Sequence, residues 1–286
     1  MEKVLDLLDA YHHANLEDVI EFELSGVIEK ESVAAYGRES FELCLSCVDY
    51  TSLNATDTGA SLAAKIAATR AKLKKNGLPE VASVCVYPCF AGAARRALSG
   101  SSIRTAVVGG GFPSACTFPE VKRLECERAI AAGAEEVDVV IAVGEVLAKN
   151  YRQVYEDLLA LREACAGVVM KVIIETGELK EIEPIFNATL VSAYAGADFV
   201  KTSTGKVPVS ATPEAVYVMC EALRQFHART GREVGIKVSG GITKPENAIS
   251  YLTIVRHKLG EEWLAPRLFR VGASQLLDNL VKACKA

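Results

Sequence analysis

Short apolar runs alternate along most of the chain with longer stretches in which apolar residues recur at helical spacing. From about residue 41 onward this alternation repeats eight times. The apolar runs predict strands at residues 41–51, 81–87, 103–108, 136–143, 168–175, 198–202, 234–239 and 267–271. The stretches between them predict helices at residues 58–75, 91–98, 119–132, 151–164, from 176 to about 195, 213–229, 245–257 and 273–285.

The predicted strands are apolar at nearly every position, which is typical of parallel strands that are covered on both faces. Eight strand–helix units favour an α/β fold of the (β/α)₈ TIM barrel type over an open doubly wound sheet. Before the barrel, an amphipathic pattern predicts helices, with apolar positions at Val4, Leu5, Leu8, Val19, Ile20, Leu24 and Val27. We therefore predict an N-terminal helical extension over residues 1–42, packed on a barrel domain over residues 43–286.

The composition indicates which binding partners are excluded and which cell compartment is expected. The net charge is −4 and the basic residues are spread along the chain, which argues against a nucleic acid or an acidic membrane surface as partner. We find no apolar run of the ~18 residues that a membrane span needs, and the charged start at Glu2 and Lys3 does not resemble a signal peptide. The nine scattered cysteines are an odd number and indicate reduced thiols, so a cytoplasmic protein is predicted.

Charged residues interrupt several of the apolar strands. Asp49 and Thr51 lie at the end of the first strand, and four further charges lie in successive strands at Asp138, Lys171, Lys201 and Lys237. A single such residue can face the helix layer and extend its charge to solvent. Charges on four successive strands fit a shared barrel lumen better, near the carboxyl ends of the strands where such barrels place their chemistry.

The two lysines on neighbouring strands suggest a specific chemistry. Burial and a second positive charge both disfavour the protonated form of an amine, so Lys201 beside Lys237 can be neutral near pH 7. A neutral amine attacks carbonyl compounds and forms a Schiff base, which acts as an electron sink for breaking a carbon–carbon bond. Asp138 is the candidate proton carrier, with Lys171 or Lys237 holding its charge in place. This chemistry needs neither a metal nor a cofactor.

Glycines and hydroxyl groups after the later strands predict an anion site. Gly240 and Gly241 follow the seventh strand, Gly272 and Ser274 follow the eighth, and Gly205 and Lys206 follow the sixth. The loops after strands seven and eight commonly bind phosphate in such barrels, where free N–H groups at a helix N-terminus favour an anion. We also place four residues among the substrate contacts, namely Asp49, Thr51, Lys171 and Thr202.

Several segments in consistent order resemble deoxyribose-phosphate aldolases. They include Gly-Ala-Asp-Phe-Val-Lys-Thr-Ser-Thr-Gly-Lys at 196–206 and five others, at residues 49–54, 85–88, 136–140, 172–179 and 269–274. The resemblance runs from about residue 43 to 280, and the first forty residues carry none of it. It implies a metal-free class I aldolase on a (β/α)₈ barrel that splits 2-deoxy-D-ribose 5-phosphate into D-glyceraldehyde 3-phosphate and acetaldehyde, in deoxyribonucleoside catabolism.

The resemblance also implies roles for individual residues. Lys201 resembles the Schiff-base lysine, Lys237 the lysine that perturbs it, and Asp138 the proton-relay carboxylate. The phosphate-loop positions of the family match Gly205, Lys206, Gly240, Gly241, Gly272 and Ser274. Thr243 stands where an arginine is common, and the sequence ends at Ala286 without the tyrosine tail of some members. These departures leave the charge facing the phosphate and the final proton transfer open.

Two other functions remain open at this point. Another Schiff-base barrel enzyme, such as a transaldolase or a keto-sugar aldolase, would use the same lysine pair. A sugar-phosphate-binding protein without catalysis is a different class, and the lysine pair with Asp138 argues against it. The expected ligands are a sugar phosphate and an aldehyde, and a homodimer is the assembly that we consider.

Overall fold

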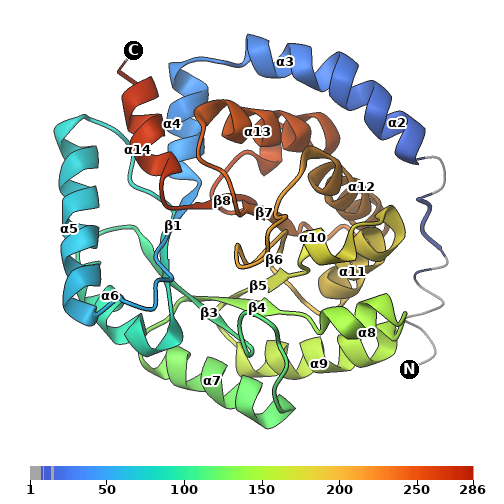
Figure 1. Cartoon of the computed structure of the whole chain (residues 1–286), viewed down its shortest axis with the longest axis horizontal. Coiled ribbons are helices and arrows are strands. Elements are labelled where there is room, and N and C mark those ends of the chain that lie inside the picture. Colours follow the sequence, from blue (N-terminus) through green and yellow to red (C-terminus); the bar gives the residue numbers. More distant parts are fainter. Residues whose placement is uncertain (1–7, 9, 14–15, 286) are drawn as a thin grey trace.

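Parallel strands close into a barrel at the centre of the molecule. The computed structural model describes residues 8, 10–13 and 16–285. Each strand pairs with the next along the chain, and β8 pairs with β1. The strands are β1 (Val48–Thr51), β2 (Ser83–Val86), β3 (Arg104–Gly109), β4 (Glu136–Val140), β5 (Val169–Ile173), β6 (Phe199–Lys201), β7 (Gly235–Ser239) and β8 (Phe269–Ala273). The predicted (β/α)₈ barrel is thus confirmed, and Figure 1 shows its strands inside a ring of helices.

A main helix follows each strand and forms this outer ring. These helices are α5 (Gly59–Lys75), α6 (Ala91–Ala97), α7 (Pro119–Ala131), α9 (Tyr151–Ala164), α11 (Ile182–Tyr194), α12 (Pro213–Thr230), α13 (Pro245–Leu259) and α14 (Leu276–Ala283). The sequence did not predict three shorter helical segments, which are η2 (Pro88–Phe90), α8 (Val143–Leu147) and η3 (Glu261–Trp263). The helix predicted from residue 176 to about 195 is divided into α10 (Thr176–Leu179) and α11. None of the helices within the described ranges is long and apolar enough to cross a membrane.

Local sequence signals fix several helix ends. Thr58 accepts a hydrogen bond from the backbone N–H of Ser61, and the Ser61 hydroxyl accepts one from the N–H of Thr58. This reciprocal capping box starts α5 at the position that the sequence predicted. The Thr212 hydroxyl caps α12 by accepting a hydrogen bond from the N–H of Ala215, and Pro213 occupies the first helical position. Helix α12 ends at Gly231, which has the positive φ angle of 69° that glycine favours.

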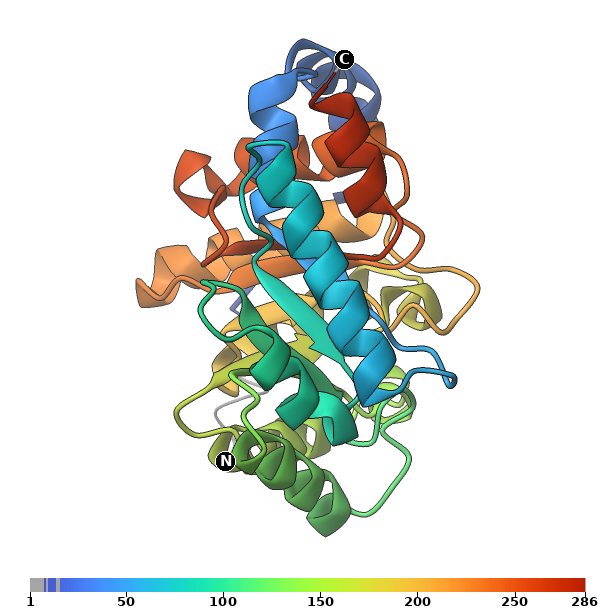
Figure 2. The ribbon, with the colours of Figure 1, turned by 90° about the vertical axis from the view of Figure 1, so that its left-hand side faces the viewer.

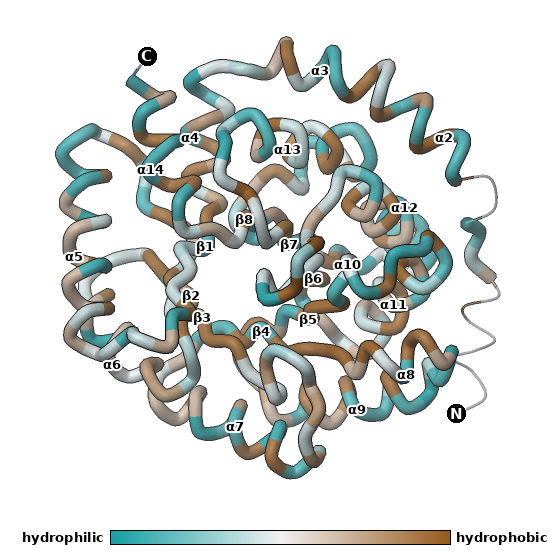
Figure 3. Tube along the Cα trace, in the orientation of Figure 1, coloured by the Kyte–Doolittle hydropathy of each residue, from teal (hydrophilic) through white to brown (hydrophobic). Residues whose placement is uncertain are grey.

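The strands separate two kinds of interior. Side chains such as Val137, Val139 and Val172 are fully buried between the barrel and the helices, where each contributes about 1.5–3 kcal/mol through burial. Alternate positions such as Glu136 and Asp138 are also fully buried, and their side chains meet those of other strands inside the barrel. In Figure 3 the tube is largely hydrophobic along β3 to β5, which agrees with this two-sided burial.

The N-terminal helices lie outside the ring, against α12 and α13 (Figure 1). The segment runs through α2 (Leu16–Glu23), the π-helical turn η1 (Leu24–Ile28) and α3 (Glu29–Ala34) without a break. Ile20 and Ile28 are buried, whereas Phe22 and Val33 are 72% and 74% exposed. The π turn adds a residue to one helical turn and so rotates the apolar face between α2 and α3. Val4 and Leu5 lie outside the described residues.

One predicted strand is partly wrong. Residues 41–46 form the last turns of the helix α4 (Arg38–Ser46), and the strand begins only at Val48. Phe41, Cys44 and Leu45 are spaced by three and four residues, which puts all three on one buried helix face. Helix α4 lies beside α14, as Figures 1 and 2 show. The domain boundary predicted at residue 43 falls inside α4, and it stays a prediction.

The start of the last helix also differs from the prediction. Residues up to Ala273 belong to β8, and α14 begins at Leu276 rather than at residue 273. The strand is longer because β8 pairs with β1 as far as Ala273, opposite Tyr50. Ser274 therefore lies in the loop between the strand and the helix.

Candidate active site

Three lysines surround one carboxylate inside the barrel. The Nζ atoms of Lys201 and Lys237 lie 2.8 and 2.7 Å from Oδ2 of Asp138. The Nζ atom of Lys171 lies 2.9 Å from the other oxygen, Oδ1. The strand register explains this meeting, because Asp138 is level with Lys171 on β5, and Lys201 is level with Lys237 on β7. The structure thus brings together the four charges that interrupt the strands in the sequence.

A second layer of charges lies beneath these groups. Arg270 on β8 donates from Nη1 to Asp49 Oδ1 at 2.6 Å and from Nη2 to Glu136 Oε1 at 2.9 Å. Asp49 Oδ2 lies 2.5 Å from Nζ of Lys237, and Glu136 Oε2 lies 2.6 Å from Nζ of Lys171. We call the resulting group the buried charge set, which comprises Asp49, Glu136, Asp138, Lys171, Lys201, Lys237 and Arg270. Its members are at most 4% exposed.

Burial and charge act differently on the two neighbouring lysines. Burial lowers the pKa of Lys201, and the ammonium of Lys237 lowers it further against the opposing pull of Asp138. Burial also opposes the charge on Lys237, but the carboxylates of Asp138 and Asp49 overcome it and raise the pKa of Lys237. Lys201 is therefore the better candidate for a neutral amine, as the sequence analysis predicted on the same physical grounds.

Asp138 is an ionised carboxylate in this environment. Burial alone would raise its pKa, but the ammonium groups of Lys171, Lys201 and Lys237 lower it well below the ordinary value. Both Lys201 and Lys237 donate to the same oxygen, Oδ2. A proton passing between these two amines through Asp138 would travel along two hydrogen bonds that already exist.

A cavity of about 340 Å³ opens above Lys201 at the carboxyl ends of the strands. Its wall includes eight of the predicted site residues, namely Thr51, Lys201, Gly205, Lys206, Gly240, Gly241, Gly272 and Ser274. Five others do not line it: Asp138 and Lys237, which lie in the buried charge set, and Asp49, Lys171 and Thr202. The cavity thus has the Lys201 amine at its floor and several glycines around its rim.

Three predicted substrate contacts are buried away from this cavity. Asp49 and Lys171 belong to the buried charge set and are fully buried. The Thr202 hydroxyl donates to the carbonyl of Ser239 and accepts from its N–H, so it ties β6 to β7. Direct substrate contact for these three residues stays a prediction, and their polar atoms are engaged with other protein groups in this structure.

Glycine allows neighbouring segments to approach closely at two positions that line the cavity, Gly240 after β7 and Gly272 within β8. At Gly240, where φ is +91°, a Cβ atom would come within 2.3 Å of the Ser210 side chain. At Gly272 a Cβ atom would lie 2.8 Å from Cβ of Ser239 and 3.1 Å from Cε of Lys237. A larger residue at Gly240 would collide with Ser210, and one at Gly272 would press on Ser239 and Lys237, so both positions favour glycine.

Comparison with known proteins identifies the family of the chain. The family model described as DeoC/LacD family aldolase matches residues 43–258. This chain belongs to that aldolase family. It is 33% identical over 280 residues to the deoxyribose-phosphate aldolase of Homo sapiens, a match covering 94% of this chain and 87% of the human protein. The resemblance found in the sequence is thereby confirmed.

Further relatives agree with this assignment. The deoxyribose-phosphate aldolase of Bos taurus is 36% identical over 247 residues, covering 82% of this chain and 78% of the bovine protein. The fold resembles that of a deoxyribose phosphate aldolase from Aeropyrum pernix, described as a tetramer, with a TM-score of 0.71 and 23% identity. That match covers 91% of this chain and 97% of the archaeal chain.

The sequence analysis of this aldolase-family chain missed three charged residues near the site. Glu136 and Arg270 complete the buried charge set, and Lys65 of α5 lines the cavity. Lys65 donates to Asp57 at 2.6 Å and to Ser52 at 3.0 Å. A signal existed for the first two, because Glu136 lies two residues before Asp138 and a strand directs such pairs to the same face. The pattern around Lys65 is that of an ordinary helix.

Lys206 and Lys244, which follow β6 and β7, differ in their position relative to the cavity. Lys206 reaches across the cavity mouth, and its Nζ atom donates to the carbonyl of Leu53 at 2.8 Å. Thr243, which stands at the position of the expected arginine, lines the cavity as a neutral residue. Lys244 is exposed and is not among the lining residues of this cavity, so Lys206 is the better placed of the two lysines to meet an anion.

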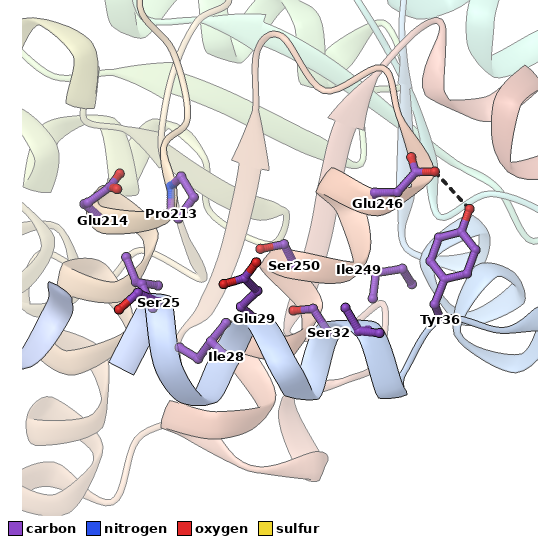
Figure 4. A pocket seen from close by; sticks show the side chains of 12 residues that line it. Ser25, Ile28, Glu29, Ser32, Tyr36, Pro213, Glu214, Glu246, Ile249 and Ser250 are labelled. Atoms are coloured by element: carbon purple, nitrogen blue, oxygen red, sulfur yellow. Dashed lines mark hydrogen bonds between the residues drawn. The ribbon is translucent and has the colours of Figure 1, made fainter. Parts of the chain in front are cut away.

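A larger hollow of about 680 Å³ lies outside the helix layer (Figure 4). It lies between the N-terminal helices and the starts of α12 and α13. The Tyr36 hydroxyl donates a hydrogen bond to Oε1 of Glu246 at 2.9 Å, at one side of this hollow. Its wall combines apolar groups such as Ile28 and Ile249 with serines and three glutamates. Among its lining residues we find no amine or thiol nucleophile, so the smaller cavity in the barrel is the candidate active site.

Proposed function

We propose that this chain catalyses the reversible cleavage of 2-deoxy-D-ribose 5-phosphate to D-glyceraldehyde 3-phosphate and acetaldehyde. The observation that carries the proposal is Lys201, a buried amine of lowered pKa that lines a cavity rimmed by glycine-rich segments and Lys206. The human and bovine relatives are named for this reaction class. Amine and anion site together fit a substrate with a carbonyl at one end and a phosphate at the other.

In the proposed reaction, the neutral Nζ atom of Lys201 attacks the aldehyde carbon C1 of the open-chain sugar. Loss of water from this adduct gives a positively charged imine. The C3 hydroxyl then loses its proton, the C2–C3 bond breaks, and its electron pair moves toward the imine to form an enamine. D-Glyceraldehyde 3-phosphate leaves. Protonation of C2 and hydrolysis release acetaldehyde and restore the amine, so atoms and charges balance over the cycle.

Asp138 and Lys237 are proposed to handle the protons of this cycle. The two hydrogen bonds to Oδ2 of Asp138 support a relay between the Lys201 nitrogen and the ammonium of Lys237. The low pKa of Asp138 suits a group that passes a proton onward and does not retain it. Lys237 has a second proposed role, since its positive charge helps to keep Lys201 neutral.

The phosphate is proposed to bind at the rim, opposite the aldehyde end. Lys206 is the proposed charge partner, with backbone N–H groups near Gly241 and Ser274 and the N-terminus of α14 as further donors. Thr51 also lines the cavity and is a proposed hydroxyl contact for the sugar. With a neutral Thr243 at the expected arginine position, the rim depends on Lys206 for its main charge.

We further propose that the reaction needs no metal, since a protonated imine supplies the electron sink that a metal would otherwise provide. The proposed setting is the cytoplasm, in the breakdown of deoxyribonucleosides, with a homodimer as the assembly considered. These proposals rest on the resemblance to the family and on the chemistry of the lysine pair.

The direct test is a substrate comparison with purified protein in the presence of a chelator. We expect release of acetaldehyde from 2-deoxyribose 5-phosphate and no loss of activity with EDTA. Faster turnover of transaldolase or keto-sugar substrates would instead favour one of the other Schiff-base enzymes. Binding of deoxyribose 5-phosphate without any turnover would favour a binding protein. Lys201→Arg, which keeps the positive charge beside Asp138, is the matched inactive control.

A further inference from the structure

We propose that Arg270 is a positioning residue with a permanent positive charge, held in place by Asp49 and Glu136. Because of this charge, Lys201 is the one basic side chain in the buried charge set that loses its proton. This inference rests on the proposed function, because it concerns how the reactive amine is kept neutral. Arg270 is 4% exposed and is not among the residues that line the cavity. It therefore acts on the reaction through other side chains.

The charges inside the barrel do not balance when every group is ionised. In the described part of the chain, the buried charge set contains three carboxylates, on Asp49, Glu136 and Asp138, and four bases. With all seven groups charged, the set carries one surplus positive charge. A net charge in a buried site is costly, so the loss of one proton from one base stabilises the set.

Other groups around the set do not remove this surplus. The thiol of Cys85 lies near the lysines, and burial raises its pKa to about 11, so it is neutral at pH 7. Arg104 on β3 lies 3.1 Å from Glu136, but its side chain is 46% exposed, so water screens its charge. Whatever charge Arg104 contributes is positive, so it increases the surplus. Phe199 on β6 packs against Arg270, with 5.4 Å between the guanidinium carbon and the ring centre.

The contacts decide which base loses its proton. Among the described residues, Lys201 pairs with one carboxylate, Asp138. Lys237 pairs with two carboxylates, and Lys171 lies within 4 Å of all three. Arg270 pairs with two and keeps its proton at any pH that proteins tolerate. Lys201 has the fewest opposite charges and is therefore the base that becomes neutral, and its lowered pKa agrees with this assignment.

Arg270 matters because its charge cannot be given up. Three of its nitrogens are engaged, since Nη1 and Nη2 donate to Asp49 and Glu136 and Nε donates to the carbonyl of Pro266. Without this charge, the set would contain three carboxylates and three lysines. Lys201 would then have to be protonated for the positive charges to equal the negative ones. Arg270 thus offsets part of the negative charge of Asp49 and Glu136, which also pair with Lys237 and Lys171, and Lys201 is left with Asp138 alone to hold its proton.

The test measures the protonation of Lys201 without using the aldolase reaction. Competitive acetylation with acetic anhydride over a range of pH, read for each lysine by mass spectrometry, reports the fraction of neutral Lys201. For Arg270→Gln we expect the labelling profile of Lys201 to move to higher pH, with labelling at pH 7 reduced roughly tenfold. Arg270→Lys keeps the positive charge and should leave the profile close to that of the unchanged protein.

Two further variants separate charge balance from a general structural defect. Glu136→Gln removes a negative charge and should move the Lys201 profile to lower pH, the opposite direction. The double variant Arg270→Gln/Glu136→Gln restores the original surplus and should return the profile toward its starting position. Shifts in the same direction for both single variants, or no shift in either, would contradict the proposal. If Arg270→Gln does not fold, Glu136→Gln is sufficient as a test. A Lys201 labelling profile that is unchanged in Glu136→Gln, or that moves to higher pH, would contradict the proposal.

The outcome is distinguishable from failure of the proposed function. If the unchanged protein releases no acetaldehyde but the labelling profiles move in opposite directions, the proposed reaction is wrong and the role of Arg270 stands. If acetaldehyde is released but Lys201 labelling is unaffected by both substitutions, the reaction stands and the role of Arg270 is wrong.

Discussion

The floor and the rim of the cavity hold charge in opposite ways. At the floor, seven charged side chains are buried together, and nearly all of their charge is matched within the protein. At the rim, glycines and the exposed Lys206 line the cavity, and Lys206 is the proposed charge partner of the phosphate. A closed network of this kind can tune the protonation of one amine, whereas an open rim can accept a charged ligand.

This difference predicts different consequences for substitutions in the two regions. A change at the floor alters a buried balance, so it should affect turnover, pH dependence and folding stability together. A change at the rim removes a solvated contact, so it should affect phosphorylated substrates selectively. The following predictions compare the two regions in order of decreasing effect.

The largest effect is expected for Lys201→Arg. The guanidinium keeps a positive charge near Asp138 but cannot lose a proton to form an imine. Cleavage of 2-deoxyribose 5-phosphate should fall by ~10⁶-fold or more, toward the uncatalysed rate. A coupled assay for D-glyceraldehyde 3-phosphate measures this, and retention of even a hundredth of the activity would remove Lys201 from the covalent role.

Asp138→Asn should lower kcat by ~10²–10⁴-fold, because an amide keeps the shape but cannot carry a proton. The sequence alone suggests a normally folded variant. The structure adds that Lys171 and Lys237 lose a shared carboxylate, so the free energy of unfolding should also fall. Kinetics and denaturant titration measure the two effects separately. A variant with more than about a tenth of the original kcat would exclude Asp138 from the relay.

Lys237→Leu should move the pH dependence of residual cleavage to higher pH. The positive charge of Lys237 lowers the pKa of Lys201, so its loss raises that pKa and the neutral amine forms only at higher pH. Each pKa unit corresponds to about tenfold less neutral amine on the acid side. The acid limb of the pH profile of kcat/KM reports this shift, and an unchanged limb would mean that burial alone tunes Lys201.

The smallest effect is expected at the rim. Lys206→Ala should lower kcat/KM for deoxyribose 5-phosphate by roughly ten- to a hundredfold, since a charge-assisted contact contributes ~1.5–3 kcal/mol. Unphosphorylated deoxyribose should be affected little. Lys244→Ala is the matched control and should change kcat/KM for neither substrate, because Lys244 is exposed and is not among the residues that line the cavity. A selective phosphate defect in Lys244→Ala, with none in Lys206→Ala, would reverse this assignment.

The sequence was sufficient to predict the barrel and the charges within it. Asp138, Lys171, Lys201 and Lys237 each interrupt an apolar strand, and in a closed barrel such interruptions meet in the lumen. Phe41 to Ser46 was assigned to a strand because the apolar run is short and continuous, although its buried residues follow a helical spacing.

Depth within the barrel could not be predicted from the sequence. The sequence does not show that Asp49 and Lys171 are fully buried in the lumen, because a residue's height along the barrel axis depends on the stagger between strands. The role of Arg270 cannot be predicted from the sequence, because its partners come from β1 and β4, far away along the chain. Pairing across the lumen is a property of the closed barrel and not of any one strand.

The central claim is that Lys201 is the amine that bonds to the substrate, and reductive trapping tests it most directly. The protein is treated with acetaldehyde and borohydride, digested, and its lysine-containing peptides are examined by mass spectrometry. We predict a two-carbon addition on the peptide that contains Lys201, with the addition absent in Lys201→Arg. An adduct on Lys237 or Lys171 in place of Lys201 would contradict the claim.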